Sequence, residues 1–395
     1  MVFNLRTFSS TESDEGELTP PKNFSLKELR VATHNFSIDN FLAEGEICKV
    51  YRGRLANGSL VVVKRACHVD RWREEQFKAE IQVGSTVSMH PNVLCLRGFC
   101  RTKKELLLVY PWMINNSLYY NLRERPNRFA WPLNWTTRKQ IALGAARGLA
   151  HLHNQGNIKI MHRGICASNI LLNVNFEAVI GGFSFATIMH ERNVEEGTIE
   201  WRTCMPRQGT GVSFSSRVGK NSADSGSSSQ SFHRYEDVYV YTPIRGRVGF
   251  IAPEYLRTGK CTLKNDVFAY GKMLLELISG QPISNFPTEV VDAKAFLPED
   301  CDRKLMNEDQ LGRVIDPNLQ GNYVEEEAER LLQLASLCSH GDPSIRPEMS
   351  DVVRTLESQF LQRDSSTRSS RNYSESDSTP YYSFPPSPFP LGIAP

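Results

Sequence analysis

The change from strand-forming to helix-forming patterns along the chain is the feature that most constrains the fold. VYRGRL and SLVVVKR flank the turn Asn57-Gly58, and an Asn-Gly turn between such runs predicts a β-hairpin. Further along, residues 267–280 are apolar nearly all round, which is typical of a helix buried in a large core. Strands followed by helices predict an α+β chain in two lobes, one small and β-rich, the other large and helical.

Helical patterns place further elements on both sides of this change. Ser25 and Glu28 have the spacing of a capping box and predict the start of a first helix. Residues 72–83 predict a charged, mostly exposed helix. In the second part of the chain the pattern predicts an apolar stripe of Ile141, Ala145, Leu149 and Leu152, and helices over residues 325–338 and 349–360.

The 395 residues suffice for one two-lobed domain of roughly 300 residues with flanking segments. Segments with little periodicity, rich in Ser, Pro or Gly, mark the parts outside it. A segment such as NSADSGSSSQ is either a tolerated surface loop or a docking and phosphorylation segment. The pattern predicts a flexible tail over 1–22, a β-rich lobe over 23–112, a helical lobe over 113–362 with a flexible insertion over 190–243, and a disordered tail over 363–395.

Composition excludes several classes of function. The net charge of +2 gives no field for nucleic acid or for a membrane surface, so we expect no nucleic-acid partner. The nine cysteines include no CxxC pair, which indicates reduced thiols in the cytosol. The longest apolar run, residues 106–114, is about half of what a membrane helix needs, so we expect no direct insertion into a membrane.

Short motifs with charged or polar residues follow one another along the chain. Lys64 lies on the second strand of the predicted hairpin, and Glu80 lies on the next helix, where the two can pair. His162-Arg163 precedes Asn169 by the spacing of a catalytic loop. The later motif residues are Glu254 in an Ala-Pro-Glu triplet, Asp266 and Arg346. The order of these motifs resembles that of a protein kinase.

The amino-acid sequences of longer segments identify the family more specifically than the short motifs do. FSLKELRVATHNFS, VYRGRLANGSLVVVKR, LRGFC, LLVYPWM, IALGAARGLAHLH, FEAVIG, IAPEYLRTGK and LLELISGQ resemble the cytoplasmic domain of plant leucine-rich-repeat receptor kinases, nearest to the somatic embryogenesis receptor kinases. The resemblance covers roughly residues 22–360 apart from 190–243. It implies a two-lobed protein-kinase fold, a cytoplasmic location with recruitment to the plasma membrane by a partner, and receptor-like kinases or other signalling proteins as partners.

The chain departs from this family at the residues that transfer phosphate. The family has an aspartate after His-Arg that accepts the proton of the substrate hydroxyl, and Gly164 stands there. The magnesium-binding aspartate of the family's Asp-Phe-Gly motif is Gly182. Cys166 replaces a lysine that helps to hold the transferring phosphate. The resemblance therefore implies no catalytic residue at these positions, and a cleft in which Mg²⁺ binds poorly.

The nucleotide site that the resemblance implies is also reduced. Its G-x-G-x-x-G pattern falls on Ala43, Gly45 and Cys48, so one glycine of three remains to let backbone N–H groups approach phosphates. Glu46 adds a negative charge inside this loop. We expect weak binding of ATP at most, through Leu42, Gly45, Val50, Lys64, Glu80 and Asn169, with bracing of the loop as the favoured role of Asn169.

The residues that the chain keeps are structural ones. In the family, counterparts of Glu254 and Arg346 form a buried ion pair that ties the activation segment to the large lobe. The counterpart of Asp266 anchors the backbone of the catalytic loop, to which His162 and Arg163 belong. We therefore expect fold residues to be kept where chemical residues are lost.

Three functions follow. The first is a pseudokinase that acts as a binding or regulatory partner in plant receptor-kinase signalling. The second is an atypical serine/threonine kinase in which Glu195 or Glu196 of the insertion replaces the missing base. The third is a nucleotide-sensing switch that binds ATP without turnover.

Overall fold

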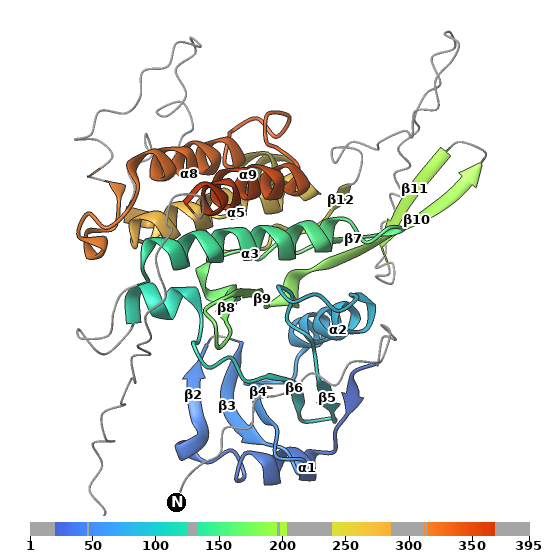
Figure 1. Ribbon diagram of the computed structural model, residues 1–395. Coiled ribbons are helices and arrows are strands. Elements are labelled where there is room, and N and C mark those ends of the chain that lie inside the picture. Colours follow the sequence, from blue (N-terminus) through green and yellow to red (C-terminus); the bar gives the residue numbers. More distant parts are fainter. Residues whose placement is uncertain are drawn as a thin grey trace, which may run out of the picture.

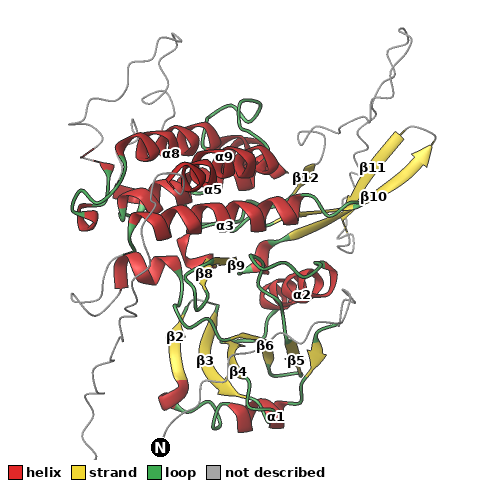
Figure 2. Ribbon diagram, viewed as in Figure 1, coloured by secondary structure: helices red, strands yellow, loops and turns green. Residues whose placement is uncertain are grey.

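Strands gather at one end of the molecule and most helices at the other in the computed structural model of the protein (Figures 1 and 2). The fold is therefore the predicted α+β arrangement of a β-rich lobe and a helical lobe. The structure describes residues 20–45, 47–124, 133–195, 198–203, 239–285, 312 and 314–367.

A six-stranded sheet in the order β1-β5-β6-β4-β3-β2 builds the small lobe. The predicted hairpin is confirmed, because β3 and β4 pair antiparallel with Arg54 opposite Leu60 across the Asn57-Gly58 turn. Val61 and Val63 point into the core on alternate positions, as the period of two in a strand requires. The strands are β1 (Lys22–Asn23), β2 (Phe41–Glu44), β3 (Cys48–Arg54), β4 (Leu60–Ala66), β5 (Gly98–Arg101) and β6 (Leu106–Pro111).

Two helices accompany this sheet. Helix α1 (Leu26–Ala32) begins at the capping box of Ser25 and Glu28, as predicted. Helix α2 (Arg71–Thr86) begins at Asp70, whose side chain caps the first turn. The prediction that α2 is mostly exposed is wrong for one face, because Gln76, Phe77 and Glu80 are buried.

Helices α3 (Trp135–His153) and α5 (Leu263–Ser279) form the centre of the large lobe. The predicted stripe on α3 is fully buried, and α5 is buried along its whole length. Helix α8 (Glu325–Cys338) packs on α5, and α9 (Met349–Thr367) packs on α3 and continues past the predicted boundary at 362. None of the helices in the described ranges is long and apolar enough to cross a bilayer.

Short elements complete the large lobe. Helix α4 (Pro253–Thr258) begins within the Ala-Pro-Glu triplet, with Ala252 as its N-cap. Two small sheets pair β8 (Ile170–Leu172) with β9 (Ala178–Ile180), and β12 (Tyr239–Tyr241) with β13 (Lys260–Thr262). Single helical turns cover Ile38–Asn40, Tyr120–Glu124, Ala167–Asn169, Phe183–Phe185, Ile283–Asn285 and Pro317–Leu319.

The segment predicted as a flexible insertion over 190–243 begins and ends in strands instead. Strand β10 (Thr187–Glu195) pairs with β7 (Ile158–Met161) and then with β11 (Thr198–Thr203), and this hairpin projects away from the body in Figure 1. Backbone hydrogen bonds to β7 hold the start of this segment in a strand, and such bonds do not require a periodic pattern of side chains. Residues 204–238 lie outside the described residues, as do most of the predicted tails, 1–19 and 368–395.

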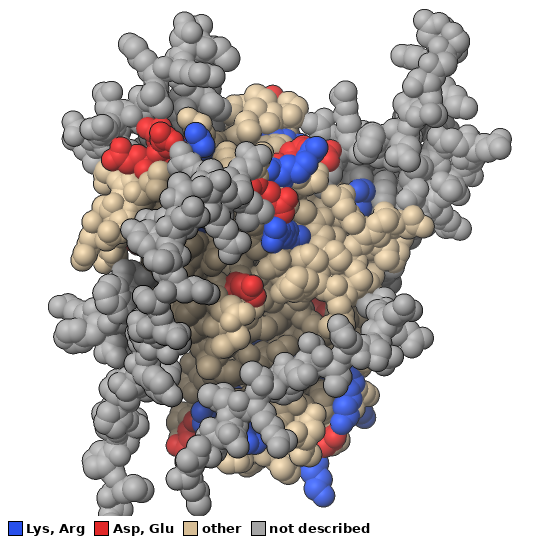
Figure 3. Space-filling model, viewed as in Figure 1, with Lys and Arg blue, Asp and Glu red and all other residues tan. Residues whose placement is uncertain are grey.

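Basic and acidic side chains are interspersed on the face shown in Figure 3. Neither sign forms a continuous patch over the described residues of that face, in keeping with the near-neutral net charge.

Candidate functional site

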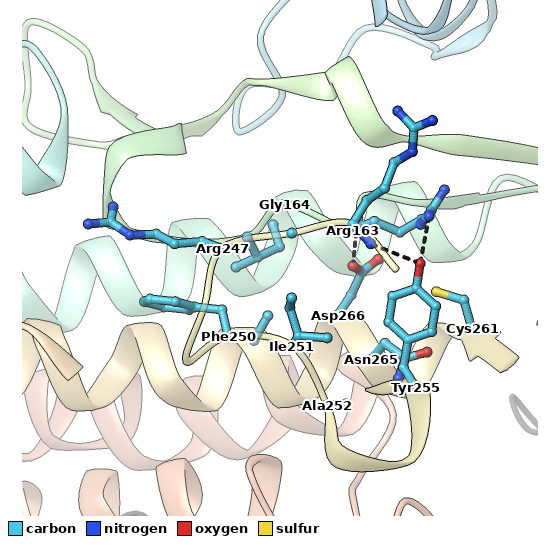
Figure 4. A pocket seen from close by; sticks show the side chains of 14 residues that line it. Arg163, Gly164, Arg247, Phe250, Ile251, Ala252, Tyr255, Cys261, Asn265 and Asp266 are labelled. Atoms are coloured by element: carbon cyan, nitrogen blue, oxygen red, sulfur yellow. Dashed lines mark hydrogen bonds between the residues drawn. The ribbon is translucent and has the colours of Figure 1, made fainter. Parts of the chain in front are cut away.

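The loop that carries His162 and Arg163 is held by one buried carboxylate. Asp266, in the first turn of α5, accepts hydrogen bonds from the backbone N–H groups of His162 and Arg163, each at 2.7 Å. Its carboxylate also lies 3.1 Å from His153 Nε2. Figure 4 shows Asp266 and Tyr255 pointing toward Arg163 from α5 and α4. Burial raises the pKa of Asp266, but the hydrogen bonds from His153 and the Arg163 backbone outweigh it and lower the pKa overall.

His162 is locked in its neutral form inside the large lobe. Its Nε2 lies 3.0 Å from Gly181 O and donates to it, while its Nδ1 accepts the Gly164 N–H at 3.1 Å. Its ring packs at 5.1 Å from the Phe183 ring. Because the side chain is fully buried, desolvation lowers the pKa of His162 below the usual value.

We expect the free energy of unfolding to fall as pH drops below about 6.5, the unperturbed pKa of histidine. Below that pH His162 becomes protonated in the unfolded chain but stays neutral in the folded one, because its pKa is lowered there. The stability that neutral, buried His162 contributes is fully present above that pH. Below it, the free energy of unfolding falls by up to about 1.4 kcal/mol per pH unit. Urea denaturation between pH 7.5 and pH 5 checks this. A His162→Leu variant should show a shallower pH slope, and an unchanged slope would contradict the assignment.

Asn169 fills the space in front of Gly182. Its Nδ2 donates to Gly164 O at 2.7 Å, so its side chain links the two glycines. Gly182 has a φ of +79°, and a Cβ at that position would overlap the Asn169 side chain. A Cβ at Gly164 would meet its nearest neighbour, His162 Nδ1, at 3.4 Å, which is ordinary contact. Asn169 thus braces the loop, as the favoured interpretation had it.

The predicted ion pair between Lys64 and Glu80 is absent. Glu80, 2% exposed, accepts hydrogen bonds from the Tyr110 hydroxyl and from Ser184 Oγ, the latter at 2.8 Å. Lys64 Nζ instead lies 5.0 Å from the centre of the Tyr110 ring. The hydroxyl groups of Tyr110 and Ser184 therefore donate the hydrogen bonds to the Glu80 carboxylate, in place of the expected ion pair with Lys64.

A cavity of about 260 Å³ lies between α2, β4 and the catalytic-loop region. It contains Lys64, Glu80 and Asn169 of the predicted nucleotide residues, together with Gly164 and Gly182. The other three are not brought there: Leu42, Gly45 and Val50 belong to the β2–β3 hairpin, and Glu46 lies outside the described residues. The remaining lining residues are Ile47, Cys48, Ala66, Arg73, Gln76, Phe77, Leu106, Leu108, Cys166, Ser184, Phe185 and Arg247.

This cavity does not fit a magnesium ion. Mg²⁺ prefers several oxygen ligands in octahedral geometry. Among the described residues that line the cavity, Glu80 is the sole carboxylate, and both of its oxygens already accept hydrogen bonds. Asn169 Oδ1 is one amide oxygen, and no group of three or more His, Cys, Asp or Glu residues suited to a metal occurs in the part of the chain that the structure describes.

The segment that leads into α4 is tied to the large lobe by arginines. Arg346 forms the expected ion pair with Glu254, with both guanidinium–carboxylate contacts at 2.7 and 2.8 Å. Arg163 donates to Thr187, Thr242 and the Tyr255 hydroxyl, which joins the catalytic loop to both ends of the region between β10 and α4.

Several residues of the cavity were missed by sequence reasoning. Arg73 and Gln76 share one face of α2 with the predicted Glu80, at the helical spacing i, i+3, i+7, and that signal was present in the sequence. Ser184 and Tyr110 could not be found from local pattern, since their contacts with Glu80 join three distant elements.

Comparison with known proteins agrees with this geometry. Residues 36–205 and 223–356 match the family model of protein tyrosine and serine/threonine kinases. A probable LRR receptor-like serine/threonine-protein kinase of Arabidopsis thaliana and the LRR receptor kinase SERK2 of Oryza sativa subsp. japonica are each 40% identical over 342 residues, 86% of this chain. The chain spans 48% of the length of each of these relatives. The chain therefore belongs to the protein tyrosine and serine/threonine kinase family, and it is related to the plant receptor-like kinases.

Proposed function

We propose that the protein is a pseudokinase that acts as a binding or regulatory partner in plant receptor-kinase signalling. A general base typically contributes about 10²–10⁴ to a rate, and magnesium stabilises the charge that develops on the phosphates. One relative is named as a probable LRR receptor-like serine/threonine kinase and the other as an LRR receptor kinase, which supports partners of that class. The proposal includes a cytoplasmic site of action with recruitment to the plasma membrane by such a partner.

One observation carries the proposal. At the two positions where the resemblance implies carboxylates, the chain has Gly164 and Gly182, and the Asn169 side chain occupies the space between them. Phosphate transfer needs an oxygen anion to orient the hydroxyl and another to hold the metal, and glycine supplies neither. The interactions that shape the fold, by contrast, are present at Asp266 and at Glu254.

Phosphate transfer from radiolabelled ATP to the protein itself and to a generic substrate protein tests the proposal. We expect incorporation at background in the full chain with Mg²⁺ or Mn²⁺, and the same background in a Lys64→Ala variant. Incorporation that disappears in Lys64→Ala would overturn the proposal, because Lys64 lines the cavity and a contaminating kinase would be unaffected by its loss.

An active enzyme with a substitute base is the second candidate, and the geometry does not favour it. Glu195 is the last residue of β10, at the far end of the hairpin that projects from the body, and Glu196 lies outside the described residues. The third candidate, a switch that binds ATP without turnover, is favoured by the cavity around Lys64. A bound ligand at 100 times its Kd would stabilise the fold by about 2.7 kcal/mol, which melting experiments detect.

A further inference from the structure

The hairpin of β10 and β11 is only partly supported by the body of the protein. Strand β7 pairs with β10 from Thr187 to His190. From Glu191 onward, β11 is the one strand among those that the structure describes that pairs with β10. This outer part projects away from the body (Figure 1). An isolated two-stranded hairpin is marginally stable in water, and a third strand stabilises it.

The two edges of the outer hairpin differ in how well they can accept another strand. On β10 the register shifts between Asn193 and Glu195, and such a bulge blunts an edge because it bends and twists the strand. Strand β11 pairs regularly with β10 from Ile199 to Thr203, and no strand of the described ranges lies on its other side. An edge strand presents unpaired backbone N–H and C=O groups. We therefore expect an added strand to pair with β11.

The sequence of β11, Thr-Ile-Glu-Trp-Arg-Thr, is complementary to itself in one antiparallel register. When Trp201 stands opposite Trp201 of a second copy, Glu200 stands opposite Arg202, and this pair occurs twice about the two-fold axis. Opposite charges in directly opposed positions stabilise a pair of strands, and like charges there destabilise it. The sequence of β11 therefore favours a second copy of β11 as the added strand.

Other arrangements of two β11 strands lose this complementarity. An antiparallel pair centred on Glu200 or on Arg202 opposes like charges, and so does a parallel pair in register. The intermediate register that sets Glu200 opposite Trp201 contains no charge pair. Within its own hairpin Glu200 is already in register with Arg192, so Arg202 of a second copy continues an alternation of charge across the strands.

We propose that the protein self-associates through β11, which pairs antiparallel with β11 of a second copy about a two-fold axis at Trp201. The two hairpins then form one continuous sheet between two molecules, in the isologous arrangement that is usual for homodimers. Residues 199–203 of each copy take part, far fewer than the roughly 20–30 residues a side of a standard interface, so the dimer dissociates on dilution. This partner is additional to the proposed function and does not depend on what the cleft binds.

Sedimentation of the full chain over a range of concentrations tests the charge pairing. We expect the Kd of the dimer to rise about tenfold in Arg202→Glu, because glutamates then oppose each other at two places in the dimer. Glu200→Arg should weaken self-association in the same way. An equimolar mixture of the two variants should dimerise again, since every pair across the axis is then complementary. A wild-type chain that is monomeric at every concentration, an unchanged Kd in Arg202→Glu, or a mixture no better than its components would overturn the proposal.

A cysteine placed on the two-fold axis tests the register. In the proposed pairing the two copies of position 201 are directly opposed, with Cα atoms roughly 4.5–5.5 Å apart, which a disulfide can span. Trp201→Cys should therefore give a covalent dimer under mild oxidation, above the background that native thiols such as the exposed Cys95 give in the wild-type chain. Ile199→Cys is the matched control on the same strand, because its two copies would lie roughly 14 Å apart. Equal yields of covalent dimer from the two variants would contradict the register.

Discussion

Replacing Arg346 by alanine is expected to lower the free energy of unfolding by about 3–5 kcal/mol, the usual cost of leaving a buried charge without its partner. Arg346 is 1% exposed, and its Nη1 and Nη2 both donate to the Glu254 carboxylate. Its Nε donates to His340 O at 2.7 Å. Its guanidinium also lies 4.9 Å from the Phe268 ring. Alanine would leave the Glu254 carboxylate with only the Asn265 amide, at 2.8 Å. Urea denaturation of purified protein measures the loss.

A second arginine provides the matched control. Arg354 pairs with Asp351 on the surface of α9, where the two side chains are 77% and 43% exposed. Exposed pairs contribute between zero and about 1 kcal/mol because water and salt screen them. Arg354→Ala should therefore change unfolding by less than about 1 kcal/mol. Similar losses in the two variants would show that burial of the Glu254–Arg346 pair is not what holds the start of α4.

Restoring an aspartate at position 182 is expected to destabilise the fold by about 1–3 kcal/mol. Gly182 has a φ of +79°, where a residue with a side chain is strained. Its new Cβ would also displace Asn169 and break the hydrogen bond from Asn169 Nδ2 to Gly164 O, which accounts for about 0.5–1.5 kcal/mol of that loss. Chemical denaturation of Gly182→Asp gives the value.

Two further variants make this prediction specific. Gly164→Asp should lose less, because its Cβ would meet His162 Nδ1 at an ordinary 3.4 Å. Combining Gly182→Asp with Asn169→Ala should cost less than the sum of the two single changes, since alanine removes the side chain that obstructs the aspartate. Strict additivity in that cycle would mean that Asn169 does not occupy the space in front of Gly182.

The elements that were predicted correctly each have a signal within a few residues of the sequence. The Asn57-Gly58 turn, the Ser25 capping box and the apolar segment that became α5 all lie where they were predicted. Strands β10 and β11 were missed because the pairing of β10 depends on β7, which lies almost 30 residues earlier in the chain.

The residues of the candidate site were predicted from the sequence, but only some of their contacts were. The motif order located Asp266, Glu254 and Arg346, whose partners in the structure are the expected ones. It gave the wrong partner for Glu80, because a carboxylate between a lysine and two hydroxyl groups takes whichever donor the three-dimensional packing presents. The sequence also contained no sign that the Asn169 side chain fills the space at Gly182. That placement depends on the rotamer of Asn169 and on its hydrogen bond to the backbone carbonyl of Gly164.

Binding of Mn²⁺, followed by its electron paramagnetic resonance signal, addresses most directly whether the cleft can hold a divalent ion. Mn²⁺ takes the same oxygen ligands as Mg²⁺, and its signal distinguishes ions in solution from ions held by protein. With the full chain and no nucleotide, we predict the signal of free Mn²⁺ alone, and the same signal for Asn169→Ala. One Mn²⁺ held per chain in the native protein, and released in Asn169→Ala, would contradict the account.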